Sequence, residues 1–241
     1  MLILGLDTTT LACSAALLGG DTLLAEYTLN IRKTHSERLM PLVDALLQES
    51  AVEREQLEAI AVAAGPGSFT GIRIGVSTAR ALAQGLDIPV AGVSTLLALA
   101  EAVPSPGALI CRLLDARRGE VYSALYRREP APSSGLEMLF PPAAVEIDAL
   151  AGRLKRYGEP VIFTGEGLPA YGSYLASKLG SAAILPQAPQ RLCRAAWVAL
   201  CGRRFLEKNP GSSFHEVLPQ YLRRPEAERR LAEQKEAPPC P

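Results

Sequence analysis

The chain of 241 residues has no formal net charge, few aromatic residues and only two histidines. The lack of net charge and the scarcity of histidine make certain classes of function improbable. Lys and Arg total 25, as do Asp and Glu, so the formal net charge is zero. A protein that grips nucleic acid by itself usually carries a basic excess, because phosphate neutralisation dominates its affinity. We therefore expect no direct binding of tRNA or other nucleic acid by the isolated chain.

Cysteine and histidine patterns for metal sites are also missing. The five cysteines, at 13, 111, 193, 201 and 240, are odd in number and include no CxxC pair, which predicts reduced thiols in a cytoplasmic protein. His35 and His215 stand without an HExxH motif, and Gly-x-Ser-x-Gly does not occur. The sequence therefore offers no catalytic residue and no metal ligand set, and a metalloprotease or serine hydrolase is disfavoured.

Long hydrophobic runs are absent as well. No apolar stretch reaches 18 residues, so we expect no membrane-spanning helix. Only six residues precede Asp7, which is too short for the apolar core of a signal peptide. Both observations favour a cytoplasmic location.

What is present is a faint internal repeat. Residues 3–17 and 111–125 each read as an apolar strand, a polar turn and a second strand, with Asp7 superposed on Asp115. Residues 58–67 and 159–167 each read as an apolar run that ends in Gly-x-Gly. Two matches in the same order indicate a duplicated unit, although chance similarity stays open as the alternative.

Each half predicts strands alternating with helices. In the first half, periodicity predicts strands at 23–28, 59–64 and 89–93 and helices at 36–50 and 69–84. Strands that alternate with helices form a mixed sheet covered on both faces. Two such halves in tandem predict the α/β, two-lobed actin-like (ASKHA) fold, a duplicated ribonuclease-H-like unit.

Local sequence features predict where the elements begin and end. Thr34 and Glu37 fit a capping box that begins the first helix. Pro41 lies inside this pattern and costs a hydrogen bond or a bend there, so a later start of the helix is the alternative. Gly85 can end the second helix. Residues 129–142, rich in Pro and Ser, read as a loop, and residues 191–208 read as the last helix.

These features predict three parts of the chain. The N-terminal lobe covers 1–106, the C-terminal lobe covers 107–222, and a loosely ordered tail covers 223–241. The last helix, at 191–208, is a candidate to pack back on the first lobe.

The turn after the first strand is a candidate phosphate site. In actin-like folds this turn contacts nucleotide phosphates, and here it contains Asp7, Thr8, Thr9 and Thr10. Backbone amides and hydroxyls suit phosphate oxygens, while Asp can hold a metal-bound water. Asp and Thr are also ordinary turn residues, so a purely structural turn is the alternative. The matching turn at Asp115 lacks the hydroxyls, and we therefore interpret the site as vestigial.

The string from Gly65 to Gly75, GPGSFTGIRIG, is the most specific in the chain. A glycine-rich turn enters a helix that Ser68 or Thr70 can cap, but the Walker ending is absent. The helix is apolar nearly all round, and Gly71 and Gly75 would let another helix approach closely. The preceding helix is also more apolar than one core face requires.

Two such helices predict a partner-binding surface, with a core shared between the lobes as the alternative. The residues predicted to form this interface are Leu39, Met40, Val43, Leu47, Phe69, Gly71, Ile74, Gly75, Thr78 and Ala81.

These motifs together resemble the TsaB (YeaZ) family. The matching segments are LGLDTTT at the start, HSERLMP (35–41), AGPGSFTGIRIG (64–75), GVST (92–95), DARRGEVY (115–122) and LPQYLR (218–223). They run in family order across nearly the whole chain. The sequence from Pro225 onward matches no segment of the family that we can assign.

The resemblance implies a non-catalytic scaffold of a tRNA-modifying complex. It implies pairing with a TsaD-type transferase that places threonylcarbamoyl on the adenosine 3′ to the anticodon, together with a TsaE-type ATPase. ATP and a metal are then expected on the partner subunits, with no cofactor required by this chain and tRNA met only through the complex. The interface would be the helix pair already identified, which would also allow a homodimer when the partner is absent.

The catalytic relative of this family holds its metal through two histidines on its first helix. Here only His35 lies in that region, with Leu39 four residues later, so the resemblance implies lost chemistry. The alternative function is a stand-alone ATP-binding enzyme of the kinase or ATPase class, supported by Asp7 and the threonines after it.

Overall fold

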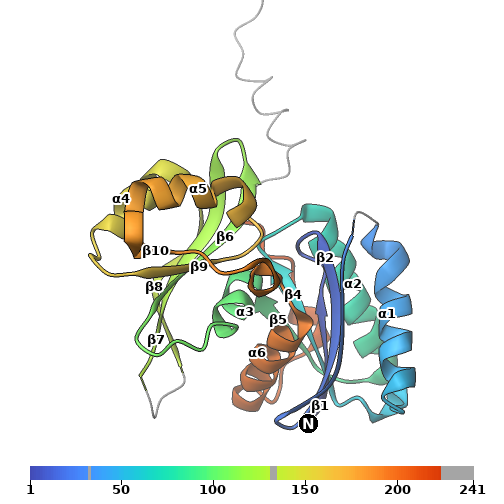
Figure 1. Ribbon diagram of the computed structural model, residues 1–241. Coiled ribbons are helices and arrows are strands. Elements are labelled where there is room, and N and C mark those ends of the chain that lie inside the picture. Colours follow the sequence, from blue (N-terminus) through green and yellow to red (C-terminus); the bar gives the residue numbers. More distant parts are fainter. Residues whose placement is uncertain (32–33, 131–134, 224–241) are drawn as a thin grey trace, which may run out of the picture.

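The computed structural model describes residues 1–31, 34–130 and 135–223, which form two lobes placed side by side (Figure 1). Each lobe is built on a five-stranded mixed sheet, with strand orders β3-β2-β1-β4-β5 and β10-β9-β6-β7-β8. Of the tail predicted at 223–241, residues 224–241 lie outside the described residues.

The first sheet opens with a buried antiparallel hairpin. β1 (Leu2–Asp7) pairs with β2 (Ala12–Gly19), and β3 (Thr22–Asn30) extends this side to the edge. On the other side, β4 (Ala59–Gly65) and β5 (Val90–Ser94) add in parallel. The central strands are apolar on both sides because helices cover both faces of the sheet.

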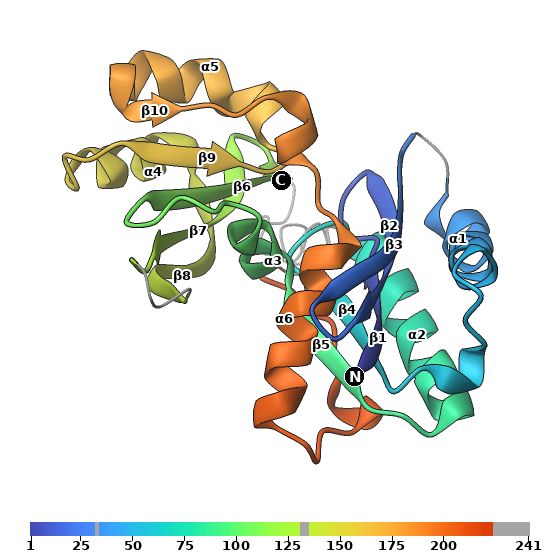
Figure 2. The ribbon, with the colours of Figure 1, turned by 60° about the horizontal axis from the view of Figure 1, so that its bottom comes forward.

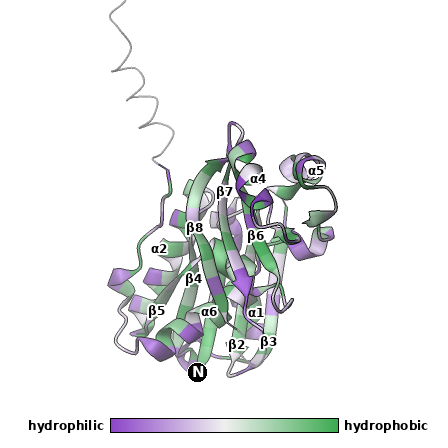
Figure 3. Cartoon of the chain, turned by 90° about the vertical axis from the view of Figure 1, so that its left-hand side faces the viewer, coloured by the Kyte–Doolittle hydropathy of each residue, from purple (hydrophilic) through white to green (hydrophobic). Residues whose placement is uncertain are grey.

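Three long helices cover this first sheet. α1 (His35–Glu49) and α2 (Phe69–Leu86) pack on one face, where their leucines, isoleucine and valines meet those of β1 and β4. α6 (Ala195–Lys208) packs on the opposite face against small residues of β4 and β5. Figure 3 shows hydrophobic colour concentrated along the strands and the helix surfaces beside them.

The second sheet repeats the pattern. β6 (Leu109–Arg117) and β7 (Glu120–Arg128) form its hairpin, and β8 (Leu136–Glu146) pairs with β7 at one edge. β9 (Val161–Thr164) and β10 (Ala183–Ile184) extend the other side in parallel.

The helices of the second lobe complete the layers. α4 (Ile147–Lys155) and α5 (Leu168–Leu179) cover one face of the second sheet, while α3 (Thr95–Glu101) packs on the other. Figure 2 shows α3 lying between the two sheets. Short 3-10 helices lie in the connections, at Arg54–Gln56, Gly180–Ala182, Ala188–Arg191 and Phe214–Glu216.

The order of elements confirms the predicted actin-like fold. Each half runs hairpin, third strand, helix, strand, helix, strand, and each sheet has the same neighbours in the same order. The connection between halves, at residues 102–108, follows α3.

The superposition of Asp7 on Asp115, however, is wrong. It would match Leu6 with Leu114, yet Leu6 packs beneath α1 and α2 whereas Leu114 packs against α3, on the face away from α4 and α5. Side chains alternate between the two faces of a strand, so an alignment that is shifted by one residue matches each inward-facing residue with an outward-facing one. The offset of 115 − 7 = 108 residues has this error. Accordingly, Asp7 is buried and Asp115 is exposed.

Several predicted element boundaries also need correction. Residues 129–142 are not all loop, because β8 starts at Leu136 and tolerates Pro141 and Pro142 at the sheet edge. The first helix begins at His35 and contains Pro41, and the Thr34 side chain makes no capping bond. The last helix begins at Ala195, four residues after the predicted start.

The second helix extends beyond its predicted end. α2 continues past Gly85 to Leu86, and the following residue, Asp87, adopts the left-handed conformation with φ of 54°. Asp tolerates this conformation better than most non-glycine residues, which allows it to end the helix.

A buried ion pair joins α3 to the second sheet. Arg128 of β7 contacts Glu101 at 2.9 Å, and both side chains are less than 10% exposed. The same guanidinium donates to the carbonyls of Ala100 and Glu101 at the end of α3, each at 3.1 Å. Arg128 thus donates to carbonyls at the C-terminal end of α3 and fixes this helix between the lobes.

We expect Arg128→Met to lower the free energy of unfolding by about 2–3 kcal/mol, because Glu101 would lose its buried partner and keep only the more exposed Arg204, at 3.1 Å, while the carbonyls at the end of α3 would lose a charged donor. The neighbouring Arg127→Met is the matched control: its ion pair with Glu159 is solvent-exposed, and its loss should cost less than about 1 kcal/mol. Urea denaturation measures both variants. Equal losses would contradict the role given to Arg128.

Candidate functional site

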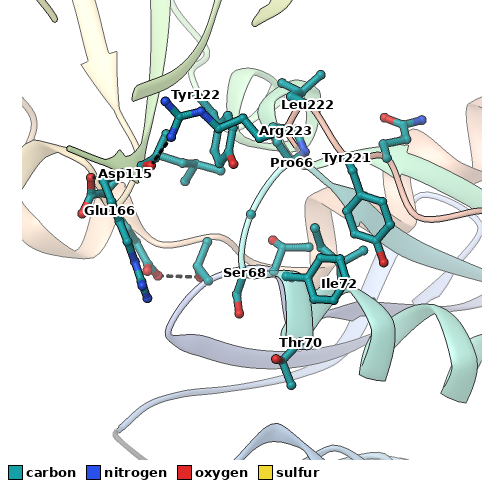
Figure 4. Close-up of a pocket in the computed structure, with 18 of the residues that line it drawn as sticks. Pro66, Ser68, Thr70, Ile72, Asp115, Tyr122, Glu166, Tyr221, Leu222 and Arg223 are labelled. Atoms are coloured by element: carbon teal, nitrogen blue, oxygen red, sulfur yellow. Dashed lines mark hydrogen bonds between the residues drawn. The ribbon is translucent and has the colours of Figure 1, made fainter. Parts of the chain in front are cut away.

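A cleft of about 620 Å³ lies between the lobes. The turn after β1, the Gly-Pro-Gly turn before α2, the β6–β7 hairpin and the segment 220–223 line it. In Figure 4, Asp115 and Glu166 lie at one end, Ser68 and Thr70 lie below, and Tyr221 lies at the other end. The cleft therefore gathers the motifs that the sequence singled out.

The predicted phosphate turn uses most of its polar groups inside the protein. The Thr8 hydroxyl donates to the Gly71 carbonyl at 2.7 Å, and the Thr9 hydroxyl donates to the Asp7 carboxylate at 2.7 Å. The Thr9 amide also donates to Asp7, at 2.8 Å. The Ser68 amide donates to the Thr9 carbonyl at 2.6 Å. The turn after β1 is therefore hydrogen-bonded to the start of α2, and it also forms one wall of the cleft.

Thr10 is the turn residue that reaches the second lobe. Its hydroxyl donates to one carboxylate oxygen of Glu166 at 2.7 Å, and the Leu11 amide donates to the other at 3.0 Å. On the outer side, His35 Nε2 donates to the Thr10 carbonyl at 2.9 Å. His35 therefore holds the turn in place.

Burial controls the charge of Asp7. The side chain is 1% exposed, and desolvation raises the pKa of its carboxyl from 3.8 to about 6. The two hydrogen bonds from Thr9 oppose this increase of the pKa, and the nearby Glu166 charge adds to it. At neutral pH the turn therefore contains a buried carboxylate whose desolvation costs folding free energy.

The glycines of α2 face this turn and not another helix. A Cβ added at Gly71 would collide with the Thr8 carbonyl oxygen, and one added at Gly75 would lie 2.5 Å from the Thr8 hydroxyl oxygen. The expectation that these glycines admit a partner helix is therefore wrong, since α2 needs them to approach its own lobe's turn.

Burial divides the ten residues predicted to form the interface. Five are buried within the first lobe, because they pack against its own sheet or turn: Leu39, Val43, Leu47, Gly71 and Gly75. Five are partly or fully exposed, although Ile74 also packs against the core and Phe69 lines the cleft: Met40, Phe69, Ile74, Thr78 and Ala81. We call these five residues the outer helix face.

A C-terminal strap, residues 217–223, crosses from this face to the second lobe. The Gln220 amide donates to the Ala64 carbonyl at 2.7 Å, and the Tyr221 ring stacks on Phe69 with centroids 4.7 Å apart. Arg73 lies over the Phe69 ring and donates to the Tyr221 hydroxyl at 3.0 Å. These contacts join the strap to the start of α2.

The far end of the strap holds the β6–β7 hairpin. Arg223 donates to the Ala116 carbonyl at 2.8 Å and forms an ion pair with Glu120. In the sequence, LPQYLR was identified only as a segment that matches the family, and its contacts were not predicted. Glu166 was not predicted as a site residue, although its position between the two glycines of the second Gly-x-Gly turn could have indicated it.

Within the described ranges, no three His, Cys, Asp or Glu side chains gather in a way that could hold a metal ion. In the same part of the chain, none of the helices combines the length and apolar character needed to cross a bilayer.

The duplicated sheets and the cleft between them define a two-lobed protein of the actin-like class. The family model described as "TsaD: tRNA N6-adenosine threonylcarbamoyltransferase" matches residues 22–231. A Bacillus subtilis (strain 168) protein named tRNA threonylcarbamoyladenosine biosynthesis protein TsaB is 36% identical over 97% of this chain and 99% of its own length. A protein of the same name from Haemophilus influenzae is 32% identical, covering 92% and 93%.

A solved structure agrees with the sequence relatives. The structure titled "YeaZ from Pseudomonas aeruginosa" superposes with a TM-score of 0.74 at 28% identity, over 92% of this chain and 99% of that one. The chain belongs to the TsaB family, as its motifs indicated.

The raised pKa of Asp7 predicts a pH-dependent stability. Because the folded pKa of about 6 exceeds the unfolded 3.8, this residue destabilises the fold progressively as pH rises toward and through 6. Asp7→Asn cannot ionise, so its free energy of unfolding should rise relative to wild type by about 1.4 kcal/mol between pH 5 and pH 8. Urea denaturation at both pH values measures this, with Asp44→Asn, at an exposed position, as the control. A difference that is independent of pH would contradict the assignment.

Proposed function

We propose that this chain acts in the biosynthesis of threonylcarbamoyladenosine in tRNA, as a non-catalytic subunit that pairs with a TsaD-type transferase. The similarity to proteins named for this pathway supports the role. The transferase, with a TsaE-type ATPase, supplies the nucleotide and metal chemistry, and tRNA is reached through the assembled complex.

The outer helix face is the proposed docking surface. The exposed side of α2 carries the small, uncharged Ser77, Thr78, Ala81 and Gly85 together with the longer Arg73, Arg80 and Gln84, and α2 contains no Asp, Glu or Lys. Small residues let two helices approach closely, and depletion of charge is characteristic of an interface core. The same face would join two copies of the chain when the partner is absent.

The alternative, a stand-alone ATP-binding enzyme, receives less support from the cleft. The hydroxyls of Thr8, Thr9 and Thr10 already donate to groups within the chain. Calorimetry with ATP and magnesium separates the two functions: micromolar binding by the isolated chain that is lost in Asp7→Ala would favour the enzyme.

Reconstitution tests the proposed role directly. A mixture of the threonylcarbamoyl-AMP synthase, a TsaD-type transferase, a TsaE-type ATPase and tRNA should form modified adenosine only when this chain is added, since the transferase needs its docked partner. Liquid chromatography of digested tRNA measures the product. Equal product without the chain would refute the role, and product from the chain and tRNA alone would make it an enzyme.

A charge on the outer helix face should prevent docking. We expect Ala81→Glu to weaken binding to the transferase by about 2–5 kcal/mol, because the carboxylate would be buried without a partner. Ala170→Glu places the same charge on an exposed position of α5 and should bind like wild type. Calorimetry measures both variants after unfolding curves confirm equal stability. Wild-type affinity in Ala81→Glu would place the interface elsewhere.

A further inference from the structure

Arg112, in the middle of β6, is a buried arginine that the proposed function does not use. Its side chain is fully buried, and none of its nitrogens Nε, Nη1 and Nη2 reaches a hydrogen-bond acceptor within residues 1–31, 34–130 and 135–223. A guanidinium carries five N–H donors, and burial of a charge without a partner opposes folding. These donors therefore require an acceptor that the described part of the chain does not supply.

This side chain lies in the layer between the second sheet and α3. Side chains alternate along a strand, so Arg112 shares the face of Ile110 and Leu114. These two residues pack in one cluster with Leu96 and Leu99 of α3. Figure 2 shows α3 lying between the two sheets. The guanidinium is thus enclosed by apolar side chains and has no exposure to solvent.

The charges around α3 do not balance. Among the described residues they include two buried cations, Arg112 and Arg128, and one buried carboxylate, Glu101. Glu101 pairs with Arg128 at 2.9 Å and with Arg204 at 3.1 Å, so its charge is already shared. Arg128 acts on Arg112 as a like charge. The layer therefore has an excess of positive charge that is located on Arg112.

The neighbouring acids do not offset this charge. Besides Arg128, three acids among the described residues act on the Arg112 guanidinium: Cys111, Cys193 and Tyr126. Burial lowers the pKa of Arg112 from 12.5 to about 9, so the guanidinium is protonated at neutral pH. Burial raises the pKa of Cys111 and of Tyr126 to about 12, and that of Cys193 well above its ordinary value. All three acids are consequently neutral at that pH.

We propose that Arg112 binds a small monovalent anion, such as chloride, in the closed layer between β6 and α3. One negative charge offsets one guanidinium, whose fork of N–H donors can hold a single acceptor through two nitrogens. A larger anion would displace the apolar side chains that enclose the group. The site is separate from the cleft between the lobes, since Arg112 is not among the described residues that line it. It does not rest on the proposed function.

An anion that binds only the folded chain should stabilise it. At constant ionic strength, with gluconate as the replacement anion, an increase of chloride from about 10 to about 300 mM should raise the folding equilibrium constant at least about threefold. Arg112→Met removes the guanidinium and should abolish this dependence. Arg156→Met, at an exposed position after α4, should retain it. Urea denaturation measures all three proteins. A wild-type folding constant that is independent of chloride would overturn the proposal, and so would an equal dependence in Arg112→Met.

A second measurement uses wild type alone and covers the case in which Arg112→Met does not fold. Bromide has the charge of chloride and scatters X-rays anomalously. Crystals of the full chain grown in sodium bromide should therefore show an anomalous peak within hydrogen-bond distance of Nη1 or Nη2 of Arg112. Peaks confined to the protein surface would mean an adventitious ion only, and they would refute the site. Ordered water in place of bromide at the guanidinium would refute it as well.

Discussion

The arrangement of the molecule depends on one constraint: a buried turn cannot leave its polar groups without partners. The residues Asp7, Thr8 and Thr9 are almost completely buried, so their hydroxyls, amides and carbonyls must be satisfied by the protein. This requirement explains why α2 carries glycine where it meets Thr8, and why the Ser68 amide points at the turn. It also connects the lobes, because the last donors of the turn find their acceptor in Glu166.

Much of the fold follows from local sequence. Buried strands such as 59–64 appear as uninterrupted apolar runs, and the helix after the Gly-Pro-Gly turn begins at Phe69, as predicted, with Ser68, one of the two predicted caps, as its N-cap. The duplication was indicated by two short matches, because each repeat contains a hairpin and a later Gly-x-Gly turn, although the first match was aligned out of register. These features depend on neighbours in the chain, and a single sequence contains that information.

The remainder depends on contacts between distant segments. β8 was missed because its strand character comes from pairing with β7, against the local preference of Pro141 and Pro142. Gly71 was assigned to a partner because the sequence cannot reveal which side of a helix faces its own turn. The register of the repeat failed for the same reason, and the role of Glu166 exists only once the lobes have met.

The exchange of helices between the halves makes each half depend on the other for its core. α3 comes from the first half and covers the second sheet, whereas α6 comes from the second half and covers the first. A chain cut between the halves would leave the small residues of β4 open to water on one side, including Ala59, Ala61 and Ala63. Neither half therefore has a complete set of layers without the other, and the two lobes are expected to unfold as one cooperative unit.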